Sequence, residues 1–228
     1  MSKKNAKNAK ASANEFDETL AASVTFYEKH KAPILYGSGA VLAVLIIALL
    51  VHQFYITPRN RRADESIAMA QQLFSDGEYD KALNGQGDTL GFLAVADKFG
   101  STDAGNLAHL YAAKCYAESE KYQEAIDELK KFNTCGDAMV SPATIGMEGN
   151  LYAELGDNEK AVTLLVKAAD KADNNTLSPV FLMQAGQIYE ALGQNDKALD
   201  CYKQIKAKYQ NSMQYSEVDK YIERLGDK

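Results

Sequence analysis

The sequence has no tryptophan and only three cysteines and three histidines in 228 residues. So sparse and odd a set of cysteines is not a disulfide framework, and Cys115 and Cys201 lie in helical patterns where a small buried thiol is expected. A Cys115–Cys135 bridge is the alternative in an oxidising compartment. The motifs His-Glu-x-x-His, Cys-x-x-Cys and Gly-x-Ser-x-Gly are absent. We therefore expect a non-enzymatic protein with no catalytic, cofactor-binding or metal site.

Clustered basic residues are also lacking in the larger part of the chain. The formal net charge is −6, and the acidic excess lies beyond residue 56. Binding to phosphate backbones requires clusters of Lys and Arg, so we do not expect a nucleic acid as a partner.

One segment has no charged residue at all. Residues 34–56 contain no Asp, Glu, Lys or Arg and lie between Pro33 and Pro58. A helix needs about 20 apolar residues to cross a bilayer, so this segment is long enough. A cleaved signal peptide would have a shorter apolar run and a small-x-small site, whereas Thr57-Pro58-Arg59 follows here. We predict a retained transmembrane helix at 34–56, in contact with the lipid bilayer, followed by a linker at 57–62.

The segment before this helix is polar and then weakly amphipathic. Residues 1–13 are rich in Lys and are expected to be disordered. Between residues 14 and 33, Phe16, Leu20 and Tyr27 recur at helical spacing, which fits an amphipathic helix or a loosely ordered tail. Basic residues flank both sides of residues 34–56, so the positive-inside rule leaves the orientation open.

Residues 63–210 are self-similar. Four segments share an Ala at positions separated by 43, 36 and 37 residues, with a small residue twelve positions earlier and a large one nine positions earlier. This pattern resembles the tetratricopeptide repeat (TPR), in which two antiparallel helices cross closely at small residues. The predicted repeat-packing residues are Ala70, Ala82, Ala113, Tyr116, Ala125, Gly149, Tyr152, Ala161, Gly186, Tyr189 and Ala198.

The resemblance predicts an all-α fold, in which a single N-terminal transmembrane helix precedes a TPR α-solenoid of about four helical hairpins. Between the two helices of each hairpin stands a turn residue, Gly77, Glu120, Gly156 or Gly193, and the glycines are expected to end the first helix in a left-handed conformation. Glycines near residues 84–88 predict a break in the second helix of the first repeat. Residues 211–228 are expected to form a helix that caps the solenoid.

TPR arrays bind peptides or helices in a groove lined by the first helix of each repeat. The alternative for several of these side chains, Leu110 and Val180 in particular, is a place in the core between repeats. The groove has few basic positions, so a clamp for two carboxylates is not expected, and its apolar residues suit unfolded chain or a partner helix. The predicted groove residues are Ile67, Gln71, Phe74, Leu107, Leu110, Lys114, Gly146, Asn150, Ala153, Val180, Met183, Gln187 and Glu190.

The order of tail, the stretch Phe26–Lys31, single span and small TPR domain resembles the YfgM-like family, ancillary subunits of the SecYEG translocon. Residues Gly91–Leu93 look like the versions from Bacteroidetes-type bacteria. The resemblance implies a single-pass protein of the bacterial inner membrane, with a cytoplasmic N-terminus and a periplasmic TPR domain. It implies a scaffold or chaperone in protein secretion. Its expected partners are translocon subunits, a membrane-bound peptidyl-prolyl isomerase and unfolded secretory clients. A cytosol-facing TPR adaptor that recruits soluble partners to the membrane is the alternative.

Overall fold

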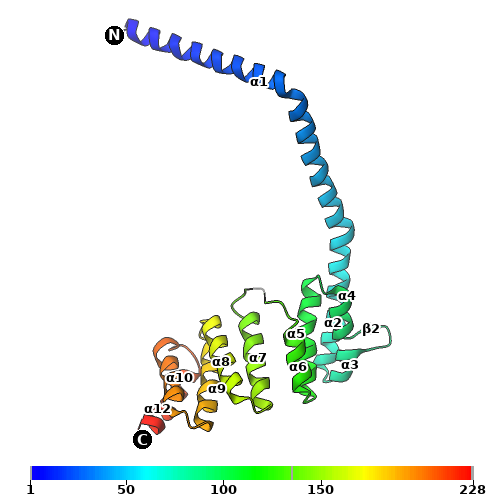
Figure 1. The fold of residues 1–228 in the computed structure, drawn as a ribbon, viewed down its shortest axis with the longest axis vertical. Helices are drawn as coiled ribbons and strands as arrows, with labels where there is room; N and C mark the ends of the chain where they lie inside the picture. The colour runs from blue at the N-terminus through cyan, green and yellow to red at the C-terminus, as the bar shows by residue number, and fades with distance from the viewer. Residues whose placement is uncertain (1, 135, 227–228) are drawn as a thin grey trace. The chain divides into compact units, whose positions relative to one another are not determined.

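The computed structural model describes residues 2–134 and 136–226, with the backbone alone at 2–19, 22 and 34. The described chain is almost entirely helical and divides into two compact units, Met1–Pro58 and Arg59–Lys228 (Figure 1). Each unit is described by itself below.

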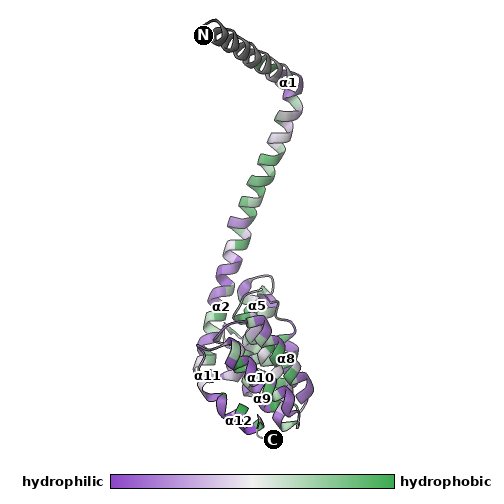
Figure 2. Ribbon diagram, turned by 90° about the vertical axis from the view of Figure 1, so that its left-hand side faces the viewer, coloured by the Kyte–Doolittle hydropathy of each residue, from purple (hydrophilic) through white to green (hydrophobic). Residues whose placement is uncertain are grey.

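The first unit is dominated by helix α1, Ser2–Val51. The described side chains between residues 35 and 57 are exposed, and the apolar stretch within them is visible in Figure 2. By its length and composition, the helical stretch that starts at Leu35 is a candidate membrane span. Residues 2–13, predicted to be disordered, are helical here. They are rich in Ala and Lys, which favour helices, and no glycine or proline interrupts the chain before Pro33.

The predicted linker at 57–62 is also helical. A π-helical turn, His52–Ile56, joins α1 to helix α2, Thr57–Ser75. The backbone N–H of Thr57 donates to the carbonyl of His52, and the Thr57 hydroxyl donates to the same oxygen at 3.0 Å. A proline cannot donate its own hydrogen bond and its ring clashes with the carbonyl four residues earlier. The wider π-turn before Pro58 relieves this conflict, so the helix continues.

The second unit is a row of helical hairpins, and its helices lie side by side in Figure 1. The second, third and fourth hairpins pair α5 with α6, α7 with α8, and α9 with α10, and each stacks on the next. One hairpin cannot bury its own apolar face, so stability comes from this stacking. The bounds are α5 Asp103–Glu118, α6 Tyr122–Leu129, α7 Val140–Glu154, α8 Asn158–Ala172, α9 Ser178–Ala191 and α10 Asn195–Lys208.

The first hairpin is formed by α2 and a second helix that is split in two. Helix α3, Tyr79–Asn84, is followed by a small antiparallel hairpin of β1, Gly85–Gln86, and β2, Thr89–Leu90. Helix α4, Phe92–Phe99, follows this β-hairpin and is the second part of the split helix. A side chain at Gly91 would lie 2.4 Å from the carbonyl oxygen of Leu83, so only glycine permits this close return.

The turns within the hairpins adopt left-handed conformations. The φ angles are +79° at Gly77, +80° at Gly156 and +71° at Gly193, and the equivalent residue in the second repeat is Glu120 at +58°. A residue with a side chain pays an energetic cost in this region that glycine avoids. At this turn, the second repeat therefore carries backbone strain that the other three do not.

We expect Glu120→Gly to stabilise the second unit. Relief of the left-handed strain, less the greater chain entropy of glycine, should raise the free energy of unfolding by about 0.5–1 kcal/mol. Thermal unfolding of the full chain in detergent measures this change. The matched control is Gly156→Ala, which should lower the stability by about 1 kcal/mol. A destabilised Glu120→Gly protein would contradict the argument.

The predicted C-terminal cap is present as two short helices rather than one. They are α11, Gln214–Glu217, and α12, Asp219–Gly226. Val218, between them, is completely buried in the core cluster of the fourth repeat.

Candidate protein-binding groove

The small residues of the repeat pattern lie where helices approach most closely. All of the predicted alanines are fully buried, and a Cβ placed on Gly149 would lie 3.1 Å from the carbonyl oxygen of Ala161. Gly186 faces the buried ring of Tyr202, 2.4 Å from where its Cβ would stand. The tyrosines at 116, 152 and 189 are half-buried beside these crossings. These contacts determine how closely each pair of helices packs, and so the shape of the groove beside them.

Four predicted groove residues lie in the core instead. Ile67, Leu110 and Met183 are between 6% and 8% exposed, and each belongs to a separate apolar cluster. Gly146 is covered by the ring of Phe181, 2.2 Å from where a Cβ would stand. The reason is stacking between repeats. The first helix of one hairpin contacts the next hairpin along part of the face that was assigned to the groove.

The other groove residues keep some exposure. Gln187 is exposed and the rest are half-buried, so they can touch a ligand without moving. The surface defined by these residues is called the groove below. They are Gln71, Phe74, Leu107, Lys114, Asn150, Ala153, Val180, Gln187 and Glu190.

An aromatic cluster lies at the end of the groove formed by the first two repeats. The ring of Phe74 packs edge-on against Tyr111 at 5.8 Å, and Tyr111 stacks on the buried Phe92 at 5.0 Å. The ammonium of Lys114 lies 5.0 Å from the centre of the Tyr111 ring. The sequence analysis did not select Tyr111, although it stands four positions after Leu107 and three before Lys114 on one helix face. This end of the groove is aromatic with one cation.

The end formed by the fourth repeat is occupied by the chain itself. The carboxylate of Glu190 accepts hydrogen bonds from Arg224 of α12 at 2.6 and 2.7 Å and from the Tyr202 hydroxyl at 2.6 Å. Gln187 donates to the hydroxyl of Tyr221 at 3.4 Å. Burial, followed by the hydrogen bond to Glu190, raises the pKa of Tyr202, so this hydroxyl remains a donor. Two groove positions are thus bound by the cap.

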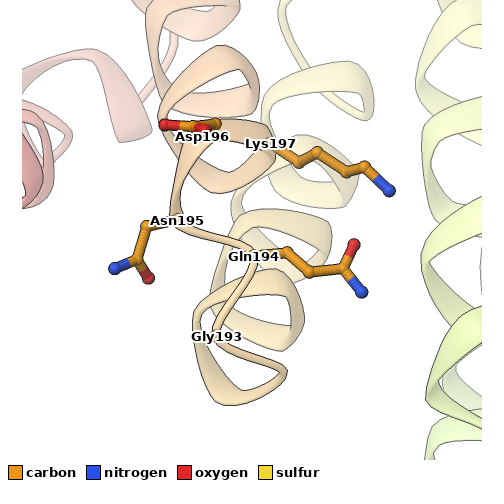
Figure 3. Close-up of a pocket in the computed structure, with 5 residues that line it drawn as sticks. All are labelled: Gly193, Gln194, Asn195, Asp196 and Lys197. Carbon is orange, nitrogen blue, oxygen red and sulfur yellow. The ribbon is translucent and has the colours of Figure 1, made fainter.

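Clefts also lie beside the second helices of the third and fourth repeats. One of about 450 Å³ contains Tyr152 and Lys160, and a smaller one contains Tyr189 and Lys197. In both, the lysine ammonium lies over the tyrosine ring, at 4.9 and 5.5 Å. A third cleft, of about 370 Å³, lies at the turn Gly193–Lys197, where the side chains of Gln194 and Lys197 point to the same side (Figure 3). The repeated lysine–tyrosine contacts are stabilising cation–π pairs within single hairpins.

Another cleft, of about 360 Å³, contains His109, Glu128 and Lys131. Glu128 is 6% exposed, and its carboxylate is satisfied by His109 Nδ1 at 2.8 Å and Lys131 Nζ at 2.7 Å. The hydrogen bond from Lys131 to Glu128 raises the pKa of Lys131. His109 lies on α5 and Glu128 on α6, so their hydrogen bond joins the two helices. Among the described residues, no group of three His, Cys, Asp or Glu side chains could hold a metal ion.

The two described cysteines are free and buried. Burial raises the pKa of Cys115 to about 12 and that of Cys201 to about 11. Because the thiolate is the reactive form, both are inert packing residues. Cys135, the other half of the alternative bridge, lies outside the described residues.

Asp137, three residues before α7, is expected to make stability depend on acid pH. Its carboxylate accepts hydrogen bonds from the Ser141 hydroxyl at 2.7 Å and the Met139 backbone N–H at 2.8 Å, which lower its pKa from 3.8 to about 2. Because folding lowers this pKa, the ionised carboxylate stabilises the folded state at pH values above the unfolded pKa of 3.8. This contribution is lost as the pH falls through about 2. Asp137→Asn should therefore lower the melting temperature at pH 7, with the difference from wild type vanishing near pH 2. Asp88→Asn, in the exposed β-turn, is the control, and an unchanged difference across this range would refute the prediction.

Comparisons with known proteins agree with this architecture. A family model described as a tetratricopeptide repeat-like domain matches residues 25–220. A crystal structure of MamA resembles the chain with a TM-score of 0.50 and 17% identity, covering 69% of this chain and 92% of that one. A second crystal structure of MamA has a TM-score of 0.53 and 17% identity, covering 72% and 90%. At this identity the likeness concerns the fold alone. None of the curated proteins compared with the chain matches it.

Proposed function

This chain belongs to the tetratricopeptide repeat-like domain family, and from that premise we propose that it is a membrane-anchored scaffold that binds other proteins in its groove. The observation that carries this proposal is the aromatic end of the groove, where Phe74, Tyr111 and Leu107 stay partly exposed beside Lys114. Partly exposed aromatic rings on a rigid helical scaffold are typical anchor points for a bound segment. The uncharged, exposed helix at residues 35–56 is the proposed anchor.

We further propose that the groove faces the periplasm of a bacterial inner membrane and holds secretory proteins as they leave the SecYEG translocon. The order of anchor and repeats, which resembles the YfgM-like family, supports this role. The end of the groove with the partly exposed Phe74, Leu107 and Tyr111 suits unfolded, partly apolar chain better than it suits acidic chain ends. The expected partners are translocon subunits, a membrane-bound peptidyl-prolyl isomerase and unfolded secretory clients. A cytosol-facing adaptor is the second candidate, because both flanks of the span carry basic residues.

Photo-cross-linking in native membranes tests this role. A benzophenone side chain replaces Tyr111, in the groove, or Lys203, exposed on α10, in the full-length protein. We expect cross-links to newly secreted chains and translocon subunits at position 111 and few at 203. Equal cross-linking at both positions, or capture of cytosolic proteins alone, would reject the proposed role. Protease treatment of intact spheroplasts separates the two candidates, since only a periplasmic repeat domain is cleaved from outside.

A further inference from the structure

The cap helix α12 is held against the fourth repeat by a polar network and by three half-buried side chains, Tyr221, Ile222 and Leu225. Arg224 binds both carboxylate oxygens of Glu190, and its guanidinium also lies 5.0 Å from the centre of the Tyr221 ring. Tyr221 in turn packs against the buried Tyr202 at 5.1 Å. A second ion pair, Lys206 with Asp219 at 2.7 Å, holds the start of the helix. On one face of α12, the contacts thus come from an aromatic residue, Tyr221, and from a cation three positions later, Arg224.

Helix α12 is weakly buried for a helix that closes a solenoid. It has eight residues, and none of them is buried. Tyr221, Ile222 and Leu225 are half-buried against the fourth repeat, whereas Val218, just before the helix, is completely buried. A short helix with no buried side chain opens at low free-energy cost while the residue before it stays in place.

The surface beneath α12 has a definite chemical preference. The side chain of Glu190 is only 19% exposed, and it also accepts a hydrogen bond from the Tyr202 hydroxyl of α10. If α12 moves away, a largely buried carboxylate loses its cation, which is unfavourable unless another cation replaces it. The half-buried ring of Tyr221 leaves an aromatic contact surface on Tyr202 at the same place.

We propose that α12 is a displaceable occupant of the groove. A partner helix with an aromatic residue followed three positions later by arginine binds on α9 and α10 in place of α12. This rests on the proposed role of the groove in binding proteins. The arginine of the partner binds Glu190 as Arg224 does, and its aromatic ring replaces Tyr221 against Tyr202. Displacement of α12 thus makes Gln187 and Glu190 available to the partner, so that the groove can be used across all four repeats.

Two measurements on the full-length protein in detergent test the displacement. The first is hydrogen exchange of the amides of α12 in wild type and in Arg224→Ala. Loss of a bidentate, partly buried ion pair should make exchange about tenfold faster. The second is binding of a fluorescent peptide with the sequence of residues 213–228. The peptide should bind Arg224→Ala about tenfold more tightly than wild type, because α12 then covers the binding surface on α9 and α10 less of the time.

Charge reversal makes the test specific. The peptide should not bind a chain that carries both Glu190→Lys and Arg224→Ala, and a peptide with glutamate in place of its arginine should restore binding to that chain. Lys203→Ala, exposed on α10, is a control expected to behave as wild type. Melting curves and circular dichroism establish that each variant is folded.

Three outcomes would overturn the displacement. They are unchanged exchange of α12 in Arg224→Ala, peptide binding that ignores the charge at Glu190, and a dimer in sedimentation experiments, which would make a second copy the occupant. Cross-linking at position 111 is read separately. If it persists while the displacement fails, the groove still binds proteins and α12 is a fixed cap.

Discussion

Ala161→Leu is expected to unfold the third and fourth repeats at temperatures where the wild type is intact. Ala161 is completely buried, and its carbonyl oxygen would be 3.1 Å from a Cβ on Gly149. A leucine at this crossing has to push the two helices apart, because Leu164 and Leu165 of α8 already lie 3.2 and 3.1 Å from where a Cβ on Gly149 would stand. We expect a loss of about 3 kcal/mol or more. For a domain of this size, that lowers the melting temperature by roughly 10 °C.

Circular dichroism melting of the full chain in detergent measures this loss, and hydrogen exchange locates it. Stability in a repeat protein is a sum of local terms, so exchange should accelerate in α7–α10 more than in α2–α5. Ala191→Leu, exposed at the end of α9, is the matched control and should change stability by less than about 0.5 kcal/mol. If Ala161→Leu melted with the wild type, these helices would not be in close contact.

Gly105→Ala is expected to be nearly as damaging, although it adds a single methyl group. The added Cβ would lie 2.0 Å from the carbonyl oxygen of Phe99 and 2.3 Å from its carbon. This carbonyl cannot move away freely, since it accepts hydrogen bonds from the Thr102 N–H and hydroxyl, both at 2.8 Å. The Thr102 hydroxyl also caps α5 by accepting from the Gly105 N–H at 3.0 Å. We expect a loss of about 3 kcal/mol, because backbone has to shift at the junction of the first two repeats.

Chemical or thermal unfolding of Gly105→Ala gives this value, with Gly87→Ala as the matched control. Gly87 lies in the exposed β-turn with φ of +59° and nothing within 4 Å of the added Cβ. Its substitution should cost about 1 kcal/mol from backbone strain alone. Equal losses in the two variants would indicate that strain, and not the contact with Phe99, limits Gly105.

The exposure of individual groove residues could not be predicted from the sequence. Leu107 and Leu110 are both leucines on α5, yet the first is half-buried in the groove and the second is 8% exposed in the core. The repeat pattern cannot separate them, because both occupy the face that the alignment assigns to the groove. Their exposure depends on how each hairpin is rotated against the next. Glu190 is a similar case, since its partner Arg224 lies 34 residues later in a helix outside the repeats.

The sequence by itself determined the number and phase of the repeats, the small residues at their crossings and the uncharged segment before them. These features are encoded locally, in spacings of a few residues set by the helical period and by which side chains fit at a close contact. Only the tertiary structure decided which groove residues stay exposed, that the cap binds Glu190, and that the helix continues through Pro58. Each of these depends on contacts between distant segments or on a change in backbone geometry. The pattern of neighbouring residues does not predict either of these causes.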